Sequence, residues 1–236
     1  MQSLQPAYVL HSRRFRESSL VVELITPTLG RHAVLAKGAL GGKGRRAALL
    51  QPFVPLLLDW RGRGELPVLT DCEAAGAAHG LAGPALYCGL YVNELVLRLC
   101  DRGDPHSTLF PVYAACIGEL AGSPPENAAL EPVLRRFELR LLEELGVGLE
   151  LERDHRGQAI DPDRRYDYRL DEGAVPVAGA EAGYAGATLL ALARGRFDAA
   201  GQRREARRLM RRVIDARLGG RPLRSRELFR PTRTTP

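Results

Sequence analysis

The stretch AYVLHSRRFRESSLVVELITPTLGRHAVLA, residues 7–36, decides the fold. It contains short runs rich in β-branched and aromatic residues, separated by turn signals such as Thr-Leu-Gly at 28–30. Such runs are typical of β-strands, and they predict strands at 8–11, 20–26 and 32–36. Two similar runs follow at 53–58 and 65–70, around an Arg-Gly-Arg-Gly turn at 61–64. The first 75 or so residues therefore predict five short strands in succession.

Five short strands in a row favour a small closed β-barrel, and an OB-fold is the natural candidate. Closing the sheet removes its edges and still leaves a face and loops for a ligand. From Gly83 onward the apolar residues recur every three to four positions, as on one face of a helix. This spacing predicts helices at 84–100, 107–120, 126–145, 187–193 and 199–218. We expect an α+β protein with an N-terminal five-stranded OB-fold barrel at 1–80 and a mainly helical domain at 81–236. The helical spacing of apolar residues is absent from residues 147–185. We expect an irregular insertion there, with short strands at 166–170 and 174–177.

The charge of the chain is distributed unevenly. Residues 1–80 carry 10 basic and 6 acidic side chains, residues 81–180 carry 10 and 17, and residues 181–236 carry 14 and 5. Two basic ends around an acidic middle favour binding of a polyanion, because their field raises its local concentration. Salt bridges from the last basic segment to the acidic middle are the alternative interpretation.

A glycine-rich basic loop, KGALGGKGRR at 37–46, follows the third predicted strand and contains the only two lysines of the chain. It is not a nucleotide P-loop, because only three residues separate Gly38 from the Gly-Lys pair and Gly44 replaces the Ser or Thr. The loop suits contact with a nucleic-acid backbone. A solvated surface turn is the alternative.

Arginines next to an aromatic residue form the second basic group, at 13–16. This composition suits single-stranded nucleic acid, whose phosphates bind cations and whose bases stack on rings; alternatively, Phe15 packs into the barrel. The third group lies on the helix predicted at 199–218, where paired arginines occupy the face opposite an apolar stripe. We predict DNA contacts from Arg13, Arg14, Arg16, Arg31, Lys37, Lys43, Arg45, Arg46, Arg203, Arg204, Arg207, Arg208, Arg211, Arg221, Arg224 and Arg226.

No pattern in the sequence assembles a catalytic centre. The five histidines are scattered, no CxxC pair occurs, and the acidic group at 154–167 is interleaved with arginines. We therefore expect no catalytic residues, no metal and no cofactor. The absence of a long apolar run and of a secretory signal leads us to expect a cytoplasmic protein.

Several segments together resemble one family. They are residues 7–31, LAKGAL at 35–40, LLQPFVPLLLDWRGRGEL at 49–66, LYCGLYVNELVLRL at 86–99, LRRFELRLLEELG at 134–146 and GGRPLRSRELF at 219–229. This series is similar to RecO, the family of bacterial recombination mediators. The resemblance implies an OB-fold followed by helices, and a nucleoid-associated role in recombinational DNA repair. It also implies binding of single- and double-stranded DNA, annealing of complementary strands, and loading of RecA together with RecR and RecF.

The resemblance also concerns a metal and a partner protein. Many relatives carry four zinc-binding cysteines after the segment LRRFELRLLEELG, whereas residues 147–185 contain none here, so the chain resembles the zinc-free branch. Relatives bind the acidic, apolar tail of the single-stranded DNA-binding protein SSB on the helical domain. We predict that Arg135, Arg136, Leu139 and Leu142 receive it, since a guanidinium pairs with a carboxylate and leucines contact apolar groups.

Two other functions suit the same charges. An OB-containing RNA-binding or ribosome-associated factor would prefer RNA through contacts to the 2′-hydroxyl. A protein that docks an acidic partner through its basic ends would bind that partner and have no affinity for DNA.

Overall fold

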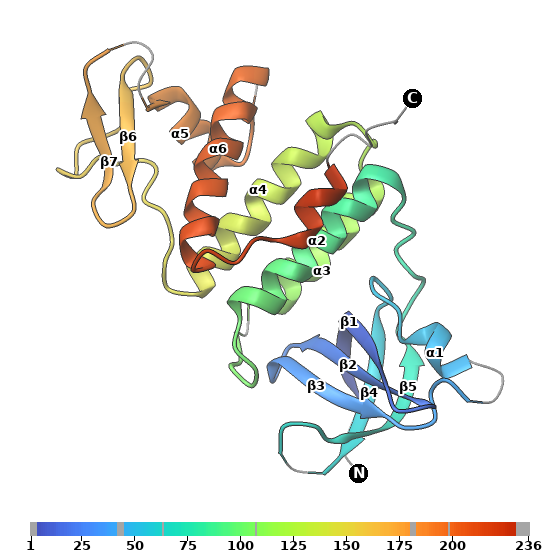
Figure 1. The fold of residues 1–236 in the computed structure, drawn as a ribbon. Helices are drawn as coiled ribbons and strands as arrows, with labels where there is room; N and C mark the ends of the chain where they lie inside the picture. The colour runs from blue at the N-terminus through green and yellow to red at the C-terminus, as the bar shows by residue number, and fades with distance from the viewer. Residues whose placement is uncertain are drawn as a thin grey trace, which may run out of the picture. The chain divides into compact units, whose positions relative to one another are not determined.

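A computed structural model describes residues 4–41, 45–62, 64–106, 108–179, 183–197 and 199–229, with the backbone alone at Arg45 and Asn127. The chain divides into two compact units. The first comprises Met1–Gly122 and Ser225–Pro236, and the second comprises Ser123–Arg224. Figure 1 shows the helices and strands of the chain.

The first unit contains the predicted five-stranded barrel. Its strands are β1 (Gln5–Phe15), β2 (Ser19–Thr26), β3 (Gly30–Ala36), β4 (Leu56–Arg61) and β5 (Val68–Ala74). They close in the order β1-β2-β3-β5-β4, and only the β3–β5 pair is parallel (Figure 1). Alternate residues point into the barrel, so Val22 and Leu24 of β2 meet Leu56 and Leu58 of β4 in its core. The prediction of an α+β fold with this barrel is confirmed.

A short helix, α1 (Arg45–Leu49), lies between β3 and β4 and contacts β5. Ala47 and Leu49 pack against the barrel core, and Leu50 is part of it. The sequence does not predict α1, because five residues are too few to show a helical period.

Two longer helices complete the first unit: α2 (Gly83–Leu99) and α3 (Leu109–Gly122). The helix α2 contacts both α3 and β1. At a bulge of β1 between Val9 and His11, the Leu10 carbonyl accepts a 2.9 Å hydrogen bond from the Asn93 side-chain amide. The Tyr113 hydroxyl donates to the other end of this amide at 2.7 Å. One buried asparagine of α2 thus satisfies polar groups of both β1 and α3.

The C-terminal motif of the sequence forms a 3₁₀ helix, η1 (Arg224–Phe229). The backbone N–H and the hydroxyl of Ser225 both donate to one oxygen of Glu94 on α2, at 2.8 and 2.7 Å. The Phe229 ring lies edge-on to Tyr87 of the same helix. These contacts give the serine and the last phenylalanine of the motif a structural role.

The second unit contains α4 (Asn127–Glu144), β6 (Arg165–Arg169), β7 (Gly173–Val177), β8 (Tyr184–Ala185), α5 (Gly186–Arg194) and α6 (Ala200–Arg217). The strands form a small sheet in the order β7-β6-β8, and Figure 1 shows β6 and β7 as neighbours. The predicted apolar stripe of α6, including Leu209, Met210 and Val213, lies in a core that also takes Tyr166 of β6 and Leu189 of α5. The arginines of α6 consequently lie on its opposite face.

None of the helices in the described ranges is both long and apolar enough to cross a membrane. Among those same residues, no three His, Cys, Asp or Glu side chains gather in a way that could hold a metal ion.

Candidate nucleic-acid interface

Three connections of the barrel meet at one end of it, which we call the loop end. They are the β1–β2 turn, the residues that follow β3, and the β4–β5 connection. The strand register places Phe15 beside Ser19, Leu20 beside Ala36, and Leu35 beside Val68. Backbone hydrogen bonds of 2.8 and 2.9 Å link Leu35 to Pro67 and Leu40 to Ser18. Basic residues from separate parts of the sequence thereby come together.

An open pocket of about 650 Å³ lies at the loop end. It is lined by Phe15, Arg16, Glu17, Ser18, Ser19, Leu35, Lys37 and Gly38. Arg16 has a left-handed backbone (φ 55°), and its guanidinium carbon lies 5.3 Å from the centroid of the Phe15 ring. The side chains of Arg16 and Lys37 are exposed, so both cations face solvent at the rim of the pocket.

Arg61 adds a third exposed cation at the loop end, and it is not among the DNA contacts predicted from the sequence. It is the last residue of β4 and pairs with Val68, which in turn pairs with Leu35. The connection between the fourth and fifth strands is a usual binding loop of OB-folds. The sequence signal for Arg61 is the Arg-Gly-Arg-Gly stretch at 61–64, because it lies between the fourth and fifth predicted strands.

Acidic residues follow the β4–β5 ladder away from the loop end. Asp59 lies directly opposite Asp71, and Glu73 lies opposite Leu57. Like charges facing each other across a ladder are unfavourable, and they repel a polyanion. The barrel thus has one cationic end, while its β4–β5 ladder disfavours DNA.

The other barrel residues predicted to contact DNA differ in how exposed their side chains are. Arg13 and Arg14 are exposed near the end of β1. Arg46 is half-buried and donates a 3.2 Å hydrogen bond to the Thr70 carbonyl. Lys43 and the Arg45 side chain lie outside the described residues.

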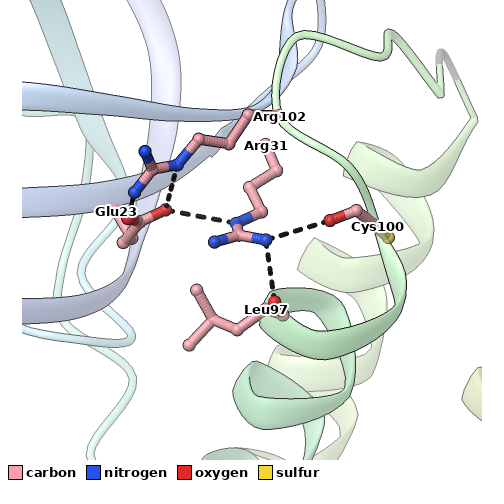
Figure 2. A network of polar contacts seen from close by, with 5 residues as sticks. All are labelled: Glu23, Arg31, Leu97, Cys100 and Arg102. Carbon is pink, nitrogen blue, oxygen red and sulfur yellow. Dashed lines mark hydrogen bonds and ion pairs between the residues drawn. The ribbon is translucent and has the colours of Figure 1, made fainter. Parts of the chain in front are cut away.

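Arg31 takes part in a polar network that joins the barrel to α2 (Figure 2). Its Nε donates to Glu23 at 3.1 Å, and its Nη1 donates to the carbonyls of Leu97 and Cys100 at 2.8 and 3.1 Å. Arg102 binds the same carboxylate. A cation at the C-terminus of a helix is stabilising, because that end carries unsatisfied carbonyls and partial negative charge. The Arg31 guanidinium is therefore engaged in hydrogen bonds within the protein. Arg31 is not part of the proposed DNA surface.

The arginines of α6 find several partners inside the second unit. Glu131 of α4 receives both Arg203 and Arg207, and Arg212 pairs with Asp167 of β6 at 3.3 Å. The Arg208 guanidinium carbon lies 4.7 Å from the centroid of the Tyr184 ring. Salt bridges to the acidic middle of the sequence, the alternative interpretation of these arginines, therefore occur.

The arginines in these ion pairs differ in exposure: the side chain of Arg203 is 24% accessible and that of its partner Glu131 is 14% accessible, whereas three other arginines remain about half exposed or more. The side chains of Arg207, Arg211 and Arg212 are 57%, 64% and 49% accessible in their ion pairs. Exposed pairs contribute about 0 to 1 kcal/mol each, so a phosphate can replace the carboxylate at little cost. Arg204, Arg221 and Arg224 are also exposed, and Arg226 is half-buried in η1.

Glu205, which lies among these arginines in the sequence, does not neutralise their face. Its carboxylate accepts hydrogen bonds from the Ala185 N–H, the Thr188 hydroxyl and Arg165, at 2.8 to 3.0 Å. Burial by itself would raise the pKa of Glu205, but these hydrogen bonds bring it below its ordinary value. Glu205 therefore joins α6 to β8 and α5, and the arginine face keeps its positive charge.

Removing an acidic partner of the α6 arginines tests whether these arginines contact DNA. Glu131→Gln should raise the affinity for DNA about threefold, because it removes the carboxylate that Arg203 and Arg207 share. The matched control is Glu143→Gln on the same helix, which changes the charge equally but frees Arg140. Fluorescence anisotropy with a labelled duplex measures both variants. Equal affinities of the two variants would contradict the assignment of the α6 arginines to DNA.

The four residues predicted to receive a peptide tail lie on α4 in different environments. Leu142 is fully buried in the core, and Arg135 is 7% exposed and pairs with Glu138 at 2.8 Å. Arg136 is exposed and donates to the Gly195 carbonyl at the end of α5, and Leu139 is partly buried beside the core. Only Arg136 and Leu139 keep surface that a tail could contact.

The chain matches known proteins along most of its length. The family described as recombination protein O, N terminal, matches residues 1–78, and recombination protein O, C terminal, matches residues 82–227. The DNA repair protein RecO of Methylococcus capsulatus is 50% identical over 96% of this chain and 93% of its own length. Those of Halorhodospira halophila (48%; 97% of both chains) and Stutzerimonas stutzeri (45%; 98% and 95%) are also similar. With its barrel, its helices and these relatives, the chain belongs to the RecO family of bacterial DNA repair proteins.

Proposed function

We propose that this protein is a DNA-binding recombination mediator without a catalytic centre. It binds single- and double-stranded DNA, anneals complementary strands, and with RecR and RecF helps to load RecA on SSB-coated single strands in the nucleoid. The observation that carries the proposal is the gathering of exposed Arg16, Lys37 and Arg61 at one end of an OB-like barrel. Cations at the binding loops of this fold suit a phosphate backbone.

The mechanism uses two cationic surfaces, one in each unit. The loop end of the barrel neutralises phosphates of one strand, and the exposed arginine face of α6 neutralises phosphates of another. Neutralisation lowers the repulsion between the strands, and it releases counterions, so binding weakens as salt rises. Base pairing then selects the partner strand, and the protein needs little sequence preference.

The proposed site for the SSB tail is reduced to Arg136 and Leu139 on α4. A guanidinium binds a carboxylate in two parallel hydrogen bonds, and Leu139 offers apolar surface one helical turn away. Arg136 also lies against Gly195, where an added Cβ would meet its side chain at 2.7 Å. The glycine thus allows the arginine to pass closely over the end of α5.

Strand annealing tests the proposed function. The wild type should anneal complementary oligonucleotides both bare and coated with SSB. Arg136→Ala should anneal bare strands normally and be at least about tenfold slower on coated strands, since a lost charged hydrogen bond costs about 1.5 to 3 kcal/mol. Arg140→Ala is the control, because Arg140 is exposed on the same helix and pairs with Glu143.

Each outcome of the annealing experiment has a separate meaning. If Arg136→Ala is equally slow on bare strands, its effect is structural and the tail site is wrong. If the wild type neither binds nor anneals DNA, the mediator function is wrong. Competition with an RNA strand of the same sequence adds a further test, because preference for RNA would favour an RNA-binding factor.

A further inference from the structure

We propose that the pocket at the loop end binds one unpaired nucleotide, with its base against Phe15 and its phosphate between Arg16 and Lys37. This inference rests on the proposed function and specifies which form of DNA the barrel prefers. The volume of about 650 Å³ lies within the range of about 300 to 1,000 Å³ that is usual for small-molecule sites.

The walls of the pocket suit a nucleobase. Phe15 is half-buried at the last position of β1, and Leu35 is half-buried at the end of β3. The fully buried barrel core of the described residues is built without Phe15, so its ring is not a core side chain. Base stacking on an aromatic side chain is worth about 1 to 3 kcal/mol and tolerates any base. An aromatic wall beside an aliphatic one favours a flat, apolar-faced ligand.

The rim of the pocket suits the rest of a nucleotide. Arg16 and Lys37 are exposed cations that a phosphate would bridge, whereas the Glu17 carboxylate repels phosphate and can accept a hydrogen bond from a base amine. The hydroxyls of Ser18 and Ser19 can donate or accept beside it. The charges thus orient the nucleotide, with its phosphate toward the two cations.

The backbone conformation of Arg16 supports a role of the β1–β2 turn in binding. A left-handed conformation costs a residue with a side chain about 1 to 3 kcal/mol, and such strain concentrates at binding sites. At φ 55° the Arg16 side chain lies over the edge of the pocket, close to the Phe15 ring. The turn therefore holds a ring and a cation together where a base and its phosphate would bind.

The pocket predicts a preference for single strands. A base in a duplex reaches it only after leaving the stack, which costs a few kcal/mol. An unpaired base enters without this cost. Phe15 should therefore contribute to binding of single strands and contribute nothing to binding of duplex, whereas Lys37 should contribute to both through phosphate.

A cycle of protein and DNA changes tests the inference. The probes are a dT oligonucleotide, a strand of equal length made of abasic sites, and a duplex. Phe15→Leu should weaken binding of the dT strand about tenfold, in keeping with the stacking energy, and leave the abasic strand and the duplex unchanged. Lys37→Ala should weaken all three. Phe229→Leu, the same substitution at a 42% exposed site on η1, should change none of them.

Two results would overturn the inference. If Phe15→Leu weakens the dT and abasic strands equally, no base stacks on Phe15. If it weakens duplex binding as much as dT binding, the pocket has no role in choosing unpaired bases. Failure of the wild type to bind any of the three probes would instead refute the proposed DNA binding, so the two failures are distinguishable.

Discussion

Replacing Arg16, Lys37 and Arg61 together by alanine should lower the affinity for a single-stranded oligonucleotide about 500-fold in 50 mM salt and about 30-fold in 200 mM. The reason is counterion release, which gives each phosphate contact on a single strand a slope of about 0.7 in log K against log salt. Loss of three contacts should therefore also reduce the magnitude of the salt slope by about 2. Anisotropy titrations at four salt concentrations measure both quantities.

The control for this variant removes three positive charges elsewhere. Arg140, Arg164 and Arg169 are exposed and form ion pairs with nearby acidic residues of the second unit. Their replacement by alanine changes the net charge equally, so it corrects for long-range attraction. If both triple variants lose the same affinity, the loop end has no special role and only net charge matters.

Replacing Asn93 by leucine should destabilise the first unit by about 3 to 5 kcal/mol. The substitution leaves two buried polar groups, the Leu10 carbonyl and the Tyr113 hydroxyl, without their partner. Each unsatisfied buried group costs about 1 to 3 kcal/mol, and the leucine gains no hydrogen bond in return. Such a loss is a large part of the free energy of unfolding of a typical protein, which is roughly 5 to 15 kcal/mol.

Urea unfolding followed by tryptophan fluorescence measures the loss in free energy of unfolding of the first unit. Trp60 is the only tryptophan of the chain, and it lies in β4 of the barrel. Tyr113→Phe is the graded control: it breaks one of the two hydrogen bonds and should cost about 1 to 2 kcal/mol. An Asn93→Leu variant as stable as the wild type would show that the bulge of β1 does not depend on this amide.

The expected elements that were found are those with a strong local pattern. The five barrel strands and the apolar stripe of α6 follow from alternation and from the helical period, and both are present. Three elements, α1, η1 and β8, were not expected, because segments of five, six and two residues show too little of a period to be identified. Arg61 was missed for another reason, since its sequence environment is that of a turn and only the strand register brings it to Arg16 and Lys37.

The sequence by itself determined the class of the protein: an OB-like barrel with helices, an excess of arginine at both ends, and the motifs of the RecO family. Periodicity and net charge are properties that adjacent residues already express. Only the tertiary structure decided which cations are free. Arg31 is occupied by Glu23 and the end of α2, whereas Arg16, Lys37 and Arg61 share one exposed end. The reason is physical, because the carboxylates and carbonyls that fold against a guanidinium are distant from it in the sequence, and only the fold decides how much of the guanidinium they leave exposed.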